Sequence, residues 1–83
     1  MRITYGAHAL DMLQERGLDR AWIERAVAKP DFAEPDALHP ERIRAYRTVP
    51  ERDGRVLRVV YVPTEDGARI VTAFLDRNRR RKP

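Results

Sequence analysis

The spacing of apolar residues predicts two helices in the first third of the chain. Apolar residues recur three and four positions apart within residues 7–16, and again within residues 20–29, as on one face of a helix. Gly17 suits the left-handed conformation that ends many helices, and Asp19 is a good N-cap for the second helix. Pro30 ends that helix, because the residue before a proline resists helical dihedral angles.

The rest of the chain is patterned as β-structure. Residues 42–49 alternate between apolar and polar side chains, and residues 68–75 form another strand-like segment. Residues 55–62 are almost continuously apolar, which predicts a central strand covered on both faces. Asp-Gly pairs mark the turns between these strands. A short edge strand is expected at Phe32 and Ala33, within a proline-rich loop.

Together these elements predict an α+β fold in which two N-terminal helices pack on one face of a three- to four-stranded antiparallel sheet. This is the simplest arrangement that buries both apolar helix faces. Residues 1–76 would form this single domain, and residues 77–83 a basic, disordered tail. The chain has neither a signal-like apolar run nor the roughly 20 apolar residues of a membrane span. We therefore expect a cytoplasmic protein.

Charge is distributed unevenly along the chain. The net charge is +4, and five basic side chains lie within residues 77–83. Residues 1–41 carry more acidic than basic side chains, whereas residues 42–58 carry six arginines against two acids. A dipolar body with a basic tail favours an anionic partner such as RNA, and a solvated arginine-rich surface is the plain alternative.

Cysteine and histidine content limits the chemistry. The chain has no cysteine, which excludes disulfides and thiolate metal sites. Its two histidines, His8 and His39, are far apart and have no metal-ligand spacing. We therefore expect no metal and no cofactor.

Two arginines interrupt faces that should be apolar. Arg47 stands among the inward-pointing side chains of its strand, and Arg58 does the same in the next strand. Burial of an unpaired guanidinium costs several kcal/mol, so each must be paired or line a cleft. One alternative is structural pairing with Asp11, Glu15 or Asp76. The other is a shared two-arginine cleft that binds phosphate through bidentate contacts.

His8 is the candidate for proton transfer. It lies in the first turn of the first predicted helix, and Glu15 returns to the same side two turns later with Arg16 beside it. A histidine in this position can donate or accept a proton near neutral pH, or can serve only in capping or packing. His39, in the proline-rich loop, is expected at the surface.

Strand tyrosines and the tail are candidates for RNA binding. Tyr46 and Tyr61 can stack on a base, donate a phenolic proton or simply pack. The basic tail can be an electrostatic tether or a solvated end. The candidate nucleic-acid-binding residues are Arg42, Arg44, Tyr46, Arg79, Arg80, Arg81 and Lys82.

The segment from His8-Ala9 to Glu15-Arg16-Gly17-Leu18 resembles the first helix of a family of small bacterial proteins labelled a domain of unknown function. The resemblance continues through strands such as Leu57-Arg58-Val59-Val60 and covers about residues 3–75. That family is similar in fold and size to the RelE, ParE and BrnT toxins of toxin–antitoxin pairs. The resemblance therefore implies a RelE-like toxin with an antitoxin protein as its partner.

Several of these related toxins are ribonucleases that stop translation. The resemblance carries over to His8, Arg16, Arg58 and Thr72, with Arg47 as the arginine of the sheet. Met12 stands where the family has an arginine, so a phosphate contact is lost here or moved to Arg16 or Arg47.

The leading hypothesis is a metal-independent endoribonuclease toxin. His8 would act as acid or base, Arg47 and Arg58 would hold phosphate, Arg16 would orient the site, and Tyr61 would be a reserve proton donor. The alternative is a non-catalytic module that binds an acidic protein or nucleic acid through its arginine-rich sheet and tail. A ParE-like toxin directed at gyrase is a third option. The expected partners are RNA and an antitoxin. The expected assembly is either a homodimer or a hetero-oligomer with the antitoxin.

Overall fold

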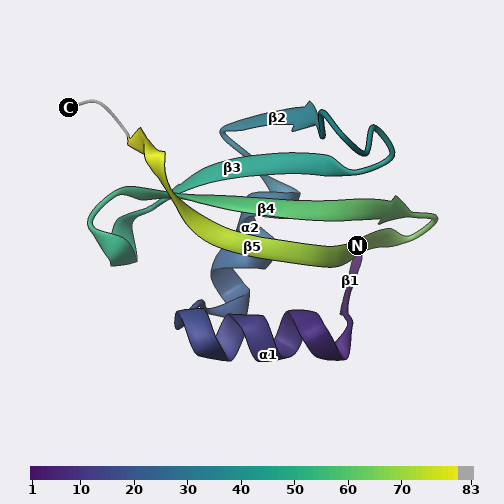
Figure 1. Ribbon diagram of the computed structural model, residues 1–83, viewed down its shortest axis with the longest axis horizontal. Helices are drawn as coiled ribbons and strands as arrows, with labels where there is room; N and C mark the ends of the chain where they lie inside the picture. The colour runs from purple at the N-terminus through teal and green to yellow at the C-terminus, as the bar shows by residue number, and fades with distance from the viewer. Residues whose placement is uncertain (81–83) are drawn as a thin grey trace.

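The described part of the chain contains five strands and two α-helices, and Figure 1 shows how they are arranged. The computed structural model describes the backbone of residues 1–80 and the side chains of residues 1–77. The elements are β1 (Arg2–Tyr5), α1 (Ala7–Arg16), α2 (Arg20–Ala28), β2 (Phe32–Pro35), β3 (Ile43–Val49), the 3-10 helix η1 (Pro50–Arg52), β4 (Arg55–Thr64) and β5 (Gly67–Arg80). The sheet order is β1-β5-β4-β3-β2. The α+β class and both predicted helices are confirmed.

The sheet differs from the expected one in size and direction. It has five strands rather than three or four, and it is mixed because β1 pairs with β5 in parallel. The four residues of β1 are too few to show a period-two pattern, so this strand was not predicted. Its pairing depends on Gly67, where an added Cβ would lie 1.8 Å from the carbonyl oxygen of Arg2. Only glycine allows the two backbones to approach this closely.

The helix ends follow the expected local chemistry. Gly17 adopts the left-handed conformation with φ 63°, and the N–H of Leu18 donates to the carbonyl of Leu13 at 3.0 Å. The carboxylate of Asp19 accepts a hydrogen bond from the N–H of Ala21 at 2.8 Å. These contacts fix the sharp turn that directs α2 away from α1.

The two helices share one hydrophobic core but occupy different places. In Figure 1, α2 passes behind β4 and β5, whereas α1 lies alongside β5, beyond the end of β1. Ile23 and Ala26 of α2 are fully buried, as are Leu57 and Val59 of β4. The side of the sheet that carries Leu57 and Val59 is called the covered face below.

The other side of the sheet has no helix over it within the described residues, and we call it the open face. Cross-strand register and alternation place these residues there: Phe32 and Glu34 of β2, Arg44, Tyr46 and Thr48 of β3, Val56, Arg58 and Val60 of β4, and Thr72, Phe74 and Asp76 of β5. The expected covering of β4 on both faces is thus made by helices on one side only. Val60 and Tyr46 are nevertheless buried, at 5% and 3% exposure, by neighbouring side chains.

A β-bulge in β5 decides which side chains reach the open face. Ile70 pairs with Tyr61 and Thr72 pairs with Val60, which leaves Val71 as an extra residue. Because of this extra residue, Ile70 and Ala73 both contribute to the core although three positions separate them. The bulge thus turns Thr72 and the residues that alternate with it toward the open face.

Candidate functional site

One row of side chains crosses the open face from edge to edge. Phe32 pairs with Tyr46, Tyr46 with Arg58, and Arg58 with Phe74, so these four residues stand side by side on consecutive strands. The rings of Phe32 and Tyr46 lie 5.9 Å apart. The Cζ of Arg58 lies 6.0 Å from the Tyr46 ring and 5.1 Å from the Phe74 ring. The guanidinium is therefore held between two aromatic side chains.

Arg58 carries an unsatisfied donor. Within the described part of the chain, its Nε is buried and has no hydrogen-bond partner. A buried donor left unpaired costs about 1–3 kcal/mol, and more when the group is charged. The structural pairing with Asp11, Glu15 or Asp76 is not among the contacts of this guanidinium. Because the Nε is buried, an anion that approaches the half-buried Arg58 can only be bound by the terminal Nη groups of the guanidinium.

Arg47 lies on the opposite side of the sheet. It pairs with Leu57, whose side chain is fully buried in the covered face. Its Nη1 donates to the carbonyl oxygen of Lys29, the residue that caps the C-terminus of α2. A cation is favourable at this end of a helix, where carbonyl groups are unsatisfied. The expectation that Arg47 and Arg58 share one phosphate cleft is therefore wrong, because alternation places them on different faces.

Tyr61 is also separated from Arg58. It pairs with Ile43 and Ile70 and packs half-buried against the core of the covered face. Its expected part as a proton donor beside the phosphate-binding arginine is not compatible with this position.

The acidic edge next to β3 engages two other candidates. The Nε of Arg44 donates to the carboxylate of Asp36 at 2.7 Å, and its Nη1 lies 3.8 Å from Glu34. The hydroxyl of Tyr46 donates to Glu34 at 3.2 Å. The guanidinium of Arg44 lowers the pKa of Asp36 to about 2, with further hydrogen bonds from the N–H groups of His39 and Leu38. Arg44 is thus an internal ion-pair partner, and its expected contact with nucleic acid stays a prediction.

A small cavity lies along one side of α1, next to β5. It measures about 220 Å³ and is lined by His8, Asp11, Met12, Glu15, Arg16 and Thr72. His8 is exposed in the first turn of the helix, whose N-cap Gly6 supplies no side-chain cap. The predicted grouping of His8 with Glu15 and Arg16 is therefore found in the structure.

Two contacts join the residues that line this cavity to β5. The Nη1 of Arg16 donates to the carbonyl of Ala73 at 2.7 Å, on the edge of β5 that β1 leaves unpaired. The hydroxyl of Thr72 lies 2.9 Å from the sulfur of Met12. Met12 is buried at 6% exposure and packs within the core.

Phe74 connects the cavity to the row on the open face. The Cζ of Arg16 lies 6.0 Å from its ring, and the Cζ of Arg58 lies 5.1 Å from the same ring. Arg16, which lines the cavity, and Arg58, on the open face, therefore adjoin one aromatic residue. Sequence analysis did not select Phe74, and the signal for it was its register opposite Arg58 across the β4–β5 hairpin.

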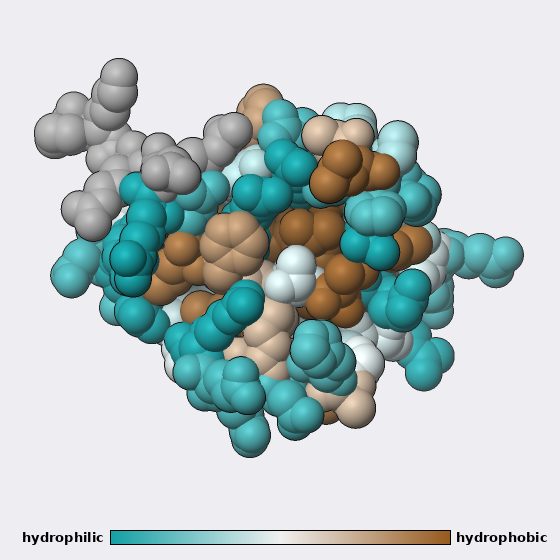
Figure 2. Space-filling view, viewed as in Figure 1, coloured by the Kyte–Doolittle hydropathy of each residue, from teal (hydrophilic) through white to brown (hydrophobic). Residues whose placement is uncertain are grey.

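Figure 2 shows the open face in the orientation of Figure 1. Hydrophobic residues gather over the middle of the sheet, and hydrophilic residues surround them. A polar rim around an apolar centre is typical of a binding surface rather than of a solvated sheet.

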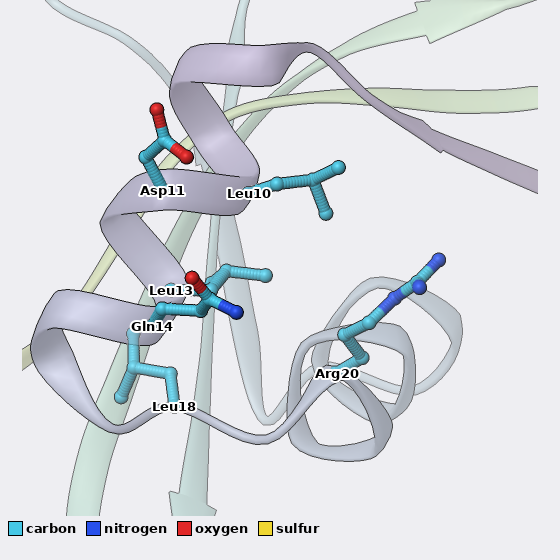
Figure 3. A pocket seen from close by; sticks show the side chains of 6 residues that line it. All are labelled: Leu10, Asp11, Leu13, Gln14, Leu18 and Arg20. Atoms are coloured by element: carbon cyan, nitrogen blue, oxygen red, sulfur yellow. The ribbon is translucent and has the colours of Figure 1, made fainter.

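A larger cavity of about 400 Å³ lies between α1 and α2, as Figure 3 shows. It is lined by Leu10, Asp11, Leu13, Gln14, Leu18 and Arg20. Leu10 and Leu13 point into the gap between the helices, and Arg20 faces them from α2. This lining includes no histidine, so it lacks the proton-transfer group that the cavity at His8 has.

The side chains of four basic candidates in the tail lie outside the described part of the structure. β5 continues to Arg80, but the side chains of Arg79 and Arg80, together with Arg81 and Lys82, lie outside the described side chains. Arg42 is half-buried beside the acidic loop, where its N–H donates to the carbonyl of His39 at 2.8 Å. The contribution of these residues to nucleic-acid binding and the limits of the tail stay predictions.

Comparison with known proteins gives a family. The model of a domain of unknown function (DUF4258) matches residues 5–75. The chain belongs to this family. The match includes His8, Arg16, Arg58 and Phe74, so the whole candidate site lies within the DUF4258 domain. No curated protein and no solved structure matches the chain.

Two further findings concern the described residues of this DUF4258 protein. None of its helices there is long and apolar enough to cross a membrane. Searched over the same residues, histidine and acidic side chains form no group of three that would hold a metal ion.

Proposed function

We propose that this DUF4258 protein is an endoribonuclease of the toxin kind that works without a metal ion. The observation that carries the proposal links the cavity lined by His8 and Arg16 to Arg58 of the open face, because Arg16 and Arg58 both lie against the ring of Phe74. The cavity supplies proton transfer and Arg58 supplies positive charge, which are the two requirements of RNA cleavage by the ribose hydroxyl.

The proposed reaction uses His8 and Glu15 as a pair. The Glu15 carboxylate takes the proton of the ribose 2′-hydroxyl, and the 2′-oxygen attacks the adjoining phosphorus. The bond from phosphorus to the 5′-oxygen breaks, and protonated His8 gives that oxygen a proton. The products are a 2′,3′-cyclic phosphate and a 5′-hydroxyl. Arg58 stabilises the negative charge that develops on the phosphoryl oxygens.

Arg16 has a positioning part in this proposal. One of its Nη atoms is already used by the carbonyl of Ala73, which fixes the guanidinium beside the cavity. Arg47 and Tyr61 are left out, because both belong to the covered face.

The proposal extends to the fold type and the partner. Two helices followed by antiparallel strands support a RelE-like fold, and we propose an antitoxin protein as the partner. The adjacent reading frame tests the partner: a small helix-rich or ribbon-helix-helix gene there supports a toxin–antitoxin pair.

Cleavage of a labelled RNA in the presence of EDTA tests the activity. We expect His8→Ala to reduce the rate by about 10²–10⁴-fold, which is the usual contribution of acid–base catalysis. His39→Ala is the matched control, since His39 is the second histidine and lies on an exposed loop beside Glu41. Cyclic phosphate ends on the product are expected. Equal rates for the wild type and His8→Ala would overturn the mechanism.

The second candidate is a binding module that does not cleave RNA. It is favoured by one observation: a buried methionine, Met12, stands where the family resemblance places an arginine. The cavity therefore lacks the cation that this position would supply. RNA binding that weakens with salt, without cleavage products and without arrest of cell growth upon expression, would support this function over the first.

A further inference from the structure

The row on the open face offers aromatic surface at both of its ends. Phe32, on edge strand β2, is 48% exposed, and Phe74, on β5, is half-buried. Between them stand buried Tyr46 and half-buried Arg58. Neighbouring strands lie about 4.8 Å apart, so the row extends about 15 Å across the sheet.

Exposed aromatic side chains in a row with a cation match the chemistry of an unpaired nucleotide chain. Each base has a flat π-face that stacks on an aromatic ring, and each phosphate is an anion that a guanidinium binds. A duplex does not fit this surface, because its bases are already stacked and paired inside the helix. A free phosphate would use Arg58 but would gain nothing from the two phenylalanines.

We infer that the row Phe32–Tyr46–Arg58–Phe74 is a stacking platform for single-stranded RNA. The two phenylalanines hold unpaired bases, and Arg58 holds the phosphate between them. The inference rests on the proposed function only for the position of the cut, because Phe74 is the residue that joins the platform to the His8 cavity. Binding to the platform does not require cleavage.

The charges along the row determine the path of the bound RNA. At the β2 end, Glu34 contacts Tyr46 and lies 3.8 Å from Arg44, so a phosphate there meets a carboxylate. At the β5 end, Arg16 and Arg58 flank Phe74. The RNA backbone therefore runs along β4 and β5 toward α1, and it presents only a base to Phe32. This path brings the phosphate next to Phe74 toward Arg16, one of the residues that line the His8 cavity.

An acidic protein segment is the competing ligand for an arginine-bearing face. It would be attracted by the same guanidinium groups and would bury apolar side chains against the valines. Its apolar side chains would pack against leucine as well as against phenylalanine, since they do not stack on a flat ring. Replacement of phenylalanine by leucine therefore separates the two ligands.

Fluorescence anisotropy with a labelled, 2′-O-methylated single-stranded RNA tests the inference. The methyl groups block cleavage, so binding is measured by itself at one fixed salt concentration. The wild type is expected to bind this probe more tightly than the same sequence in a duplex. Phe74→Leu and Phe32→Leu should each weaken binding by about 5- to 150-fold, the range for one lost base stack.

Leu38→Ala is the control for removal of an exposed apolar side chain. Leu38 is 84% exposed, lies outside the row, and its replacement should leave the affinity unchanged. Circular dichroism verifies that each variant is folded. Equal affinity for single strand and duplex, or full affinity in both leucine variants, would overturn the platform. Tighter binding of a poly-glutamate peptide than of the RNA would likewise assign the face to an acidic protein.

The two proposals fail in different ways. A platform without catalysis gives the single-strand preference and the leucine effect, while unmodified RNA stays intact. Catalysis without the platform gives His8-dependent cleavage at equal rates in wild type, Phe32→Leu and Phe74→Leu.

Discussion

The two faces of the sheet are built on different principles. The covered face is closed by helices, and its central side chains, Leu57 and Val59, are completely buried. The open face carries an arginine with an unsatisfied donor, aromatic rings and valines shielded only by their neighbours. The covered face supplies most of the hydrophobic core, and the open face is the side on which we propose that a ligand binds. Both faces are served by one strand, β4, whose alternate residues point to opposite sides.

The largest expected effect compares adjacent valines of β4 on opposite faces. Val59→Ala should lower the free energy of unfolding by about 2–4 kcal/mol, from lost transfer energy and a cavity between rigid elements. Val60→Ala should cost only about 1 kcal/mol, because the side chains over the open face can collapse onto the gap. Urea denaturation of both variants measures the difference. Equal losses would show that the open face is packed as rigidly as the core.

The second prediction separates β1 from the covered face. Gly67→Ala places a methyl group on the Arg2 carbonyl, which forces the backbones apart and should cost about 1–3 kcal/mol. Tyr5 then leaves its position against the core. Burial raises the pKa of Tyr5 to about 12, with Glu24 adding to it, so its phenol should titrate closer to 10 in the variant. Ultraviolet titration of the tyrosines measures this change.

A matched substitution distinguishes this clash from a general effect of alanine. Gly6→Ala introduces the same methyl group where no atom lies within 4 Å. We expect a cost of at most about 1 kcal/mol, from the weaker N-cap, and no change in the Tyr5 titration. A Tyr5 pKa unchanged in Gly67→Ala would contradict the assigned role of Gly67.

The difference between the two faces also explains which parts of the structure were predictable from the sequence. Both helices were predictable because their signals are local: Gly17 and Asp19 act on their own backbone. The distribution of polar residues between the faces was not, because it depends on pairing. Alternation shows that Arg58 interrupts an apolar strand, but only the register with Leu57 and Tyr46 places Arg47 and Arg58 on opposite faces.

The candidate site was predictable to a similar extent. Helical spacing brought His8, Glu15 and Arg16 to one side of α1, and the structure agrees. Phe74 was missed because strict alternation from Ala68 does not reveal the extra residue at Val71 that changes the phase of β5. A bulge costs one unpaired residue and leaves no clear sequence signal.

The third prediction exchanges the two arginines for a residue of similar length. Arg47→Met should lower the free energy of unfolding by about 1–2 kcal/mol, because the carbonyl of Lys29 loses its charged donor. Arg58→Met should leave stability unchanged or raise it by up to about 2 kcal/mol, since it removes a buried unsatisfied Nε at the expense of weak aromatic contacts. Thermal denaturation compares the pair. A strongly destabilised Arg58→Met would mean that this guanidinium is a structural element.

The smallest expected effect concerns the acidic edge of the open face. The Arg44 guanidinium, helped by two backbone N–H groups, lowers the pKa of Asp36 to about 2 from its usual 3.8. A carboxyl whose pKa is lowered by folding stabilises the protein above its unfolded pKa, and this contribution disappears as the pH falls through the folded value. The melting temperature should therefore decrease between about pH 4 and pH 2, and Asp36→Asn should flatten that decrease. Asp36 contacts Arg44 near the β2 end, whereas Phe74, at the other end of the row, lies against Arg16 and Arg58, so single-strand binding at neutral pH should survive Asp36→Asn. Loss of RNA binding in Asp36→Asn would show that the ion pair at β2 organises the whole row rather than only its edge.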